Sequence, residues 1–141
     1  MPSAKSYEYQ AAFRQLIANN ALPMDGTRVQ ALLLFAIGLH MSDQEQESAE
    51  VMKDVAQLAC DLGMNRNDYA IRYGHGQPML EECWRRTWWE VYVCDGFFTG
   101  VNPHHYNAMV LQDIKQDVFL PCEETQFHAG VSFSNRLKQR C

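Results

Sequence analysis

The side chains best suited to proton transfer lie between residues 95 and 106. Asp95 stands in the apolar stretch VYVCDGFF, where burial would raise the pKa of its carboxyl group and an arginine partner would lower it. His104, His105 and Tyr106 follow in a short polar stretch, and histidine exchanges protons near neutral pH. We predict these four residues as the catalytic group. The alternative is structural: a paired carboxylate that fixes a helix, and ordinary loop histidines.

A ligand cavity is the second chemical possibility, because residues 81–101 hold an unusual run of aromatic rings. Helical stripes of Trp and Phe usually pack in cores, so most of these rings are expected to be packing. We predict that Trp88, Tyr92 and Phe98 also line a cavity, since a buried tyrosine hydroxyl needs a partner. Arg86 could hold a ligand carboxylate or phenolate through its fixed donors. Its spacing from Glu82 and Glu90 also fits ion pairs on a solvated face.

Metal and cofactor chemistry lack the residue patterns they need. The five cysteines are odd in number and widely spaced, so we interpret them as reduced thiols. Two adjacent histidines without a third ligand at fixed spacing do not predict a metal site. The sequence has no nucleophile elbow, phosphate loop or dinucleotide fingerprint, so no cofactor is expected.

Charge and hydropathy limit the partners. With a net charge of -5 the chain has no overall excess of basic residues to contact a phosphate backbone, so direct nucleic-acid binding is not expected. No apolar run approaches the roughly 18 residues that a membrane span needs. The opening residues lack the pattern of a secretory signal, which predicts a cytoplasmic or nuclear location.

These side chains must be positioned by helices, because apolar residues recur at spacings of three and four almost throughout. One helix is predicted from Tyr9 to Ile17. Capping boxes of Thr27 with Gln30, and of Ser42 with Glu45, predict the starts of a second and a third helix.

The aromatic run is expected to form the central helix. Gly63 is predicted to end the third helix, and Pro78 suits the first turn of the next one. The stretch between them is polar and glycine-bearing, as in a loop. An irregular connection is predicted from Asn102, with a short helix or fraying from His128. The fold class is therefore a compact all-α domain over residues 1–141.

Four segments carry a resemblance to a known family: TRVQALLLFAIGLHMS, AQLACDLGMNR, EECWRRTWWEVYVCDGFFTGV and DVFLPCEE. In this order they resemble the regulatory middle homology domain of fungal binuclear zinc-cluster transcription factors, over about residues 5–126. The resemblance implies an all-helical domain that senses small molecules or restrains activity in gene regulation. The cluster of six cysteines that binds zinc and DNA in full-length members is absent from this sequence.

Two functions follow as hypotheses. In the first, the domain binds a small apolar, aromatic secondary metabolite, with cofactor-free isomerisation, rearrangement or cyclisation as its chemistry. In the second, it is a co-regulator or inhibitor module that pairs with a full-length zinc-cluster transcription factor. A homodimer is expected for a stand-alone domain, because apolar helix faces would otherwise be exposed.

Overall fold

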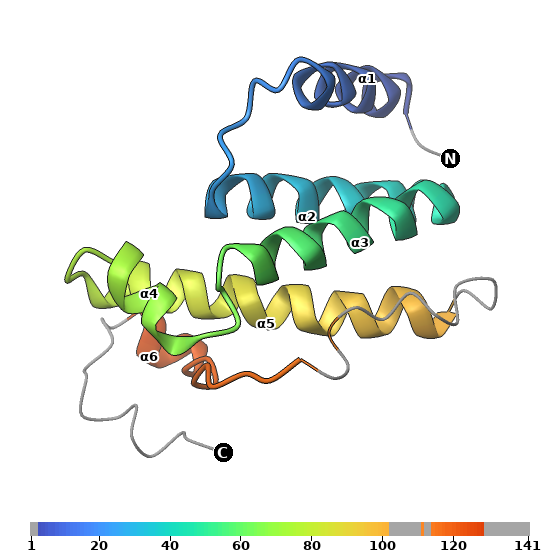
Figure 1. Cartoon of the computed structure of the whole chain (residues 1–141). Coiled ribbons are helices and arrows are strands. Elements are labelled where there is room, and N and C mark those ends of the chain that lie inside the picture. The colour runs from blue at the N-terminus through green and yellow to red at the C-terminus, as the bar shows by residue number, and fades with distance from the viewer. Residues whose placement is uncertain (1–2, 102–110, 112–113, 129–141) are drawn as a thin grey trace.

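The computed structural model describes residues 3–101, 111 and 114–128. These residues form helices and irregular segments without a strand, so the all-α prediction is confirmed. None of the described helices is long and apolar enough to cross a membrane. Figure 1 shows the helices in chain order: α1 (Ala4–Ala18), α2 (Gly26–Met41), α3 (Glu45–Asp61), α4 (Asn67–Tyr73), α5 (Pro78–Val101) and α6 (Glu124–His128).

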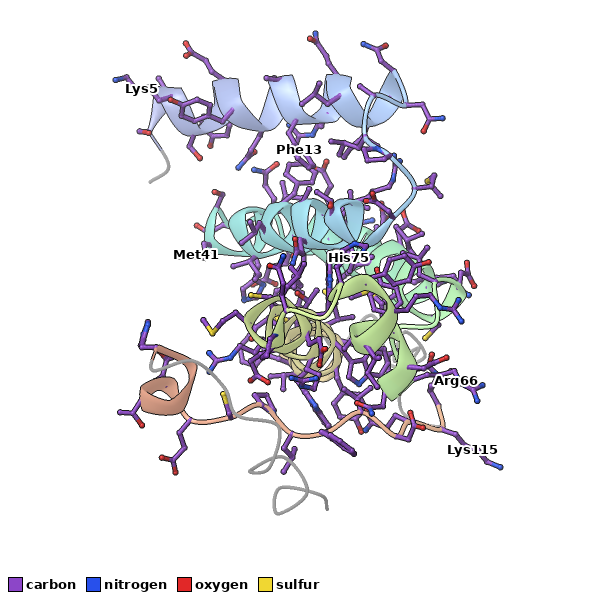
Figure 2. All side chains as sticks on the ribbon, turned by 90° about the vertical axis from the view of Figure 1, so that its left-hand side faces the viewer. Lys5, Phe13, Met41, Arg66, His75 and Lys115 are labelled. Atoms are coloured by element: carbon purple, nitrogen blue, oxygen red, sulfur yellow. The ribbon has the colours of Figure 1, made fainter. Side chains whose placement is uncertain are left out.

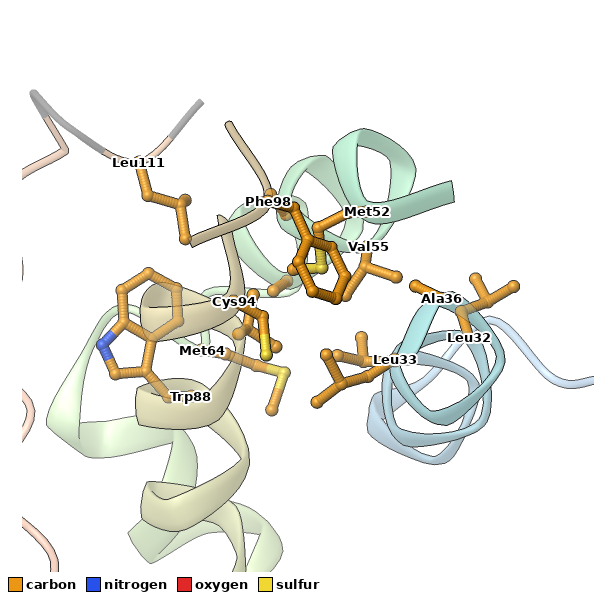
Figure 3. Packing of buried hydrophobic residues seen from close by; sticks show 14 of the residues in the cluster. Leu32, Leu33, Ala36, Met52, Val55, Met64, Trp88, Cys94, Phe98 and Leu111 are labelled. Atoms are coloured by element: carbon orange, nitrogen blue, oxygen red, sulfur yellow. The ribbon is translucent and has the colours of Figure 1, made fainter. Parts of the chain in front are cut away.

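The core lies where α2, α3 and α5 meet. Helices α2 and α5 run side by side in the same direction. Near the start of α2, Gln30 donates a hydrogen bond to Thr87, and near its end the ring of His40 stacks on Phe98. Helix α3 packs against both, and the aromatic helix α5 is central, as predicted. Figure 3 shows the cluster that fills this space, which includes Leu33, Ala36, Met52, Val55, Trp88, Cys94 and Phe98.

Two helix starts differ from the predicted capping boxes. Asp25 caps α2, because its carboxylate accepts the backbone N–H groups of Thr27 and Arg28. The side chain of Gln30, which the box would have used, binds Thr87 on α5 instead. Helix α3 begins at Glu45 without a side-chain cap, and the hydroxyl of Ser42 accepts a hydrogen bond from Gln10. Both boxes were therefore wrong: the capping positions are Asp25 and Gln44, and the side chains of Gln30 and Ser42 bind residues of other helices.

The helix ends at Gly63 and Pro78 follow the prediction. Gly63 has a φ of +81°, in the left-handed region that ends helices, and α5 begins at Pro78. The stretch between them was wrongly predicted as a loop, because it contains α4. This helix buries Tyr69 and Ala70 beside α5, and the ring of Tyr69 meets Trp84 edge-on. Two buried residues in one short helix give too little periodicity to be recognised in the sequence.

The chain returns along α5 after residue 113. Residues 114–123 have no helix or strand, in agreement with the predicted irregular connection. The indole N–H of Trp89 donates to the carbonyl of Phe119, so the returning segment is bound to α5. Helix α6 begins at Glu124, before the predicted tail helix, and residues 129–141 lie outside the described residues.

Candidate functional site

Asp95 lies in the core, on the face of α5 that the returning chain covers. Its side chain is 2% exposed, and Oδ2 accepts the backbone N–H of Leu111 at 3.1 Å. The carboxylate thus binds the backbone of the chain that returns beside α5. His104, His105 and Tyr106 lie outside the described residues, so the structure does not test the predicted catalytic group.

Arg86 binds the chain that returns beside α5. Its Nη2 donates to the carbonyl of Cys122 at 2.9 Å, and its Nη1 pairs with Glu124 at 3.2 Å. Through this contact Arg86 lowers the pKa of the Glu124 carboxyl. The expected pair with Glu82 is present at 3.2 Å. The fixed donors of Arg86 therefore hold residues of this chain, and a ligand role for Arg86 stays a prediction.

Glu82 is buried, although its spacing in the sequence predicted a position on a solvated face of α5. Its side chain is only 1% exposed. One carboxylate oxygen accepts the backbone N–H of Cys122 at 2.7 Å, and the other accepts Nε of Arg85 at 3.1 Å. Arg85 is itself 2% exposed and lies 3.8 Å from Glu81. A sequence signal for this buried network is the pair of aromatic residues Trp84 and Trp88 among these charges, which shows that the first half of α5 is also packed.

The three rings predicted to line a cavity take part in the core. Trp88 is buried, and its indole N–H donates to Gln116 at 2.6 Å. Phe98 is buried against His40, while Tyr92 is half-buried beside Trp88. A ligand role for these rings stays a prediction.

A groove between α1 and α2 could hold a small molecule. Its volume is about 700 Å³. Figure 1 shows α1 lying over α2 on the side away from α5, and Figure 2 shows Phe13 pointing from α1 toward α2. Phe13 and Phe35 form a ring pair with centroids 4.8 Å apart at this wall, beside Ala31 and Leu34. The sequence predicted both helices but missed the groove, whose signals were the all-round apolar character of α2 and the small residue Gly38.

Helix α1 is attached to the rest of the fold by polar contacts as well as by the packing of Phe13 and Ile17 against the core. The guanidinium of Arg14 binds both carboxylate oxygens of Glu47 on α3, at 2.8 and 2.7 Å. It also donates to the side chain of Gln44, which in turn donates to Gln10. We call these contacts of Arg14, Gln10, Gln44 and Glu47 the α1 clasp. The clasp attaches α1, one wall of the groove, to the start of α3.

Comparison with known proteins identifies the family. Residues 2–140 match the family model described as the fungal specific transcription factor domain. The chain belongs to this family. It is 38% identical over 123 residues to a protein named C6 finger domain transcription factor iacK from Pestalotiopsis fici. The aligned region covers 87% of this chain and 18% of that relative, so the chain spans less than a fifth of the relative's length. No solved structure matches the chain.

Three thiols of this fungal transcription factor domain, those of Cys60, Cys94 and Cys122, are partly or fully buried. Burial, with Glu90 nearby, raises the pKa of the Cys94 thiol to about 12. Burial also raises the pKa of Cys60 and Cys122. A raised thiol pKa suppresses the thiolate that binds metals and reacts. Among the described residues no three side chains of His, Cys, Asp or Glu are grouped to hold a metal ion.

Proposed function

We propose that this chain is a regulatory domain of transcription control that binds a small apolar molecule in the groove between α1 and α2. The groove is the observation that carries the proposal. Its volume of about 700 Å³ lies within the 300–1,000 Å³ that is typical of small-molecule sites. Family membership supports a regulatory role and a nuclear location.

Binding without conversion is the primary activity in this proposal. A cofactor-free isomerase or cyclase would need groups that transfer protons or stabilise charge beside the ligand. Among the described residues that line the groove, the ionisable side chains are Lys5 and Tyr9. Asp95 lies instead in the core, bound to the backbone of Leu111. Asp95 is therefore not among the residues that line the groove, and a catalytic role for it stays a prediction.

Gly38 offers a sharp test, because a side chain there would enter the groove. An added Cβ at Gly38 meets nothing within 4 Å, whereas one at Gly26 would collide with Tyr69 and Trp84. The variant Gly38→Leu should keep the fold, since leucine favours a helix interior more than glycine does. It should weaken binding of the neutral fluorescent probe N-phenyl-1-naphthylamine by about tenfold, equivalent to roughly 1.4 kcal/mol.

The matched control is Gly96→Leu. Gly96 also lies inside a helix, and its added Cβ also meets open space, but it does not line the groove. Titrations followed by probe fluorescence should give unchanged affinity for this control. Equal affinity in the wild type and in Gly38→Leu would show that the groove is not the site.

Pairing with a full-length zinc-cluster transcription factor, or with a second copy, is the second candidate. The observation that favours it is a set of exposed apolar side chains on neighbouring helices. Leu34 and Met41 on α2 are 70% and 79% exposed, and Val93 and Phe97 on α5 are exposed as well. Exposed apolar patches of this kind often mark protein interfaces.

A further inference from the structure

The groove has a different chemical character at its two ends. Phe13, Ala31 and Phe35 give one end an apolar wall, whereas Ser3, Lys5 and Ser6 lie at the other, where α1 begins. Figure 2 shows Lys5 near the N-terminal end of α1 and Phe13 further along the same helix. Among the described lining residues, Lys5 alone carries a formal charge at neutral pH.

We propose that the ligand is an elongated apolar carboxylic acid, bound with its apolar body beside Phe13 and Phe35 and its carboxylate at Lys5. This inference rests on the proposed function, because it names the class of molecule that the groove takes. An apolar body covers the exposed side chain of Leu34 and the half-buried ring of Phe13, and burial of apolar surface is the main source of affinity in such sites. The positive charge at one end then selects an acid over a neutral molecule of the same length.

The polar end has the donors that a carboxylate needs. The Lys5 ammonium is a point charge on a flexible stem, so it can follow an acid group within its reach. The Ser3 hydroxyl oxygen accepts the backbone N–H of Ser6 at 3.3 Å, which leaves its own hydrogen to donate. The partial positive charge at the start of α1, a helix of 15 residues, acts in the same direction.

Because the protein has a net charge of -5, its overall charge does not attract an acid, and any attraction must come from Lys5 itself. A protein with this charge repels acids over most of its surface. Affinity for an acid must therefore come from the local contact at the end of the groove. Removal of Lys5 should abolish the preference for an acid and leave the apolar contacts intact.

The test compares dodecanoate with dodecanol, which share one chain and differ in the charged end. Each displaces N-phenyl-1-naphthylamine from the whole protein, below the concentration at which micelles form. We expect the wild type to bind dodecanoate about tenfold more tightly than dodecanol at neutral pH. Lys5→Gln should bring dodecanoate to the level of dodecanol. The control Lys53→Gln removes the same charge from an exposed position on α3, outside the groove, and should change neither affinity.

The possible outcomes test the preference for an acid separately from the proposal that the groove binds a small molecule. Equal binding of the acid and the alcohol in the wild type, with both weakened by Gly38→Leu, would overturn the acid preference and leave the groove as the site. An equal loss of dodecanoate affinity in Lys5→Gln and Lys53→Gln would also overturn it, since the effect would then be one of net charge. Displacement that Gly38→Leu does not affect would overturn the proposed function itself.

Discussion

At the scale of single residues, the carboxylate of Glu82 joins distant parts of the chain. It binds Arg85 and Arg86 on its own helix and the backbone of Cys122, 40 residues later. The pair with Arg86 was predicted correctly from the i to i+4 spacing. Its burial was not, because residues 118–122 cover this part of α5, and helical periodicity contains no information about a segment that returns from so far away.

Replacement of Glu82 should therefore affect stability far more than an exposed acid would. Glu82→Gln keeps the shape of the side chain but removes the negative charge that two guanidinium groups share. We expect the free energy of unfolding to fall by about 3 kcal/mol, since breaking a buried ion pair leaves poorly compensated charge. Urea denaturation measures this, with Glu50→Gln on the exposed side of α3 as the control. Similar losses in both variants would show that the network contributes little beyond general charge.

At the scale of helices, local signals predicted most of the fold. Apolar periodicity located α1, α2, α3 and α5, and Gly63 and Pro78 marked boundaries because their backbone preferences act locally. Helix α4 is too short to show a period. The groove could not be predicted either, since it depends on how α1 crosses α2. The contacts that hold α1 in place, the Phe13–Phe35 ring pair and the α1 clasp, join residues more than twenty positions apart.

The α1 clasp should control how firmly the groove is closed. Arg14→Ala removes both bonds to Glu47, in a pair whose side chains are each 39% exposed. Exposed pairs contribute at most about 1 kcal/mol, so amide hydrogen exchange in α1 should quicken by roughly fivefold. Binding of N-phenyl-1-naphthylamine should weaken by a similar factor, because α1 is one wall of the groove. Lys53→Ala on α3 is the control.

Acid should loosen the same clasp. The hydrogen bonds from Arg14 lower the pKa of the Glu47 carboxyl below its ordinary value of 4.5. A lowered pKa in the folded state stabilises attachment above the ordinary value, and this stabilisation is lost as the pH falls through the lowered one. Exchange in α1 of the wild type should then approach that of Arg14→Ala at low pH. Unchanged exchange in Arg14→Ala at neutral pH would show that Phe13 and its neighbours hold α1 without the clasp.

At the scale of the whole molecule, one flank of the described fold stays apolar and uncovered. Leu34 and Met41 lie two turns apart on α2, and Val93 and Phe97 lie one turn apart on α5. The edge contact between His40 and Phe97 places the ends of the two helices together. Leu34 also lines the groove. A ligand that covers Leu34 would then change association, and association would change ligand affinity by the same factor.

A homodimer through this flank is our last prediction. The wild type should be a dimer by light scattering at micromolar concentration. The double variant with Met41→Glu and Phe97→Glu should be a monomer of unchanged helicity, because like charges would face each other across a symmetric interface. Ile71→Glu places the same charge at an exposed apolar residue on α4 and should leave the dimer intact. A monomeric wild type would exclude self-association under these conditions and leave this flank available for a larger zinc-cluster regulator.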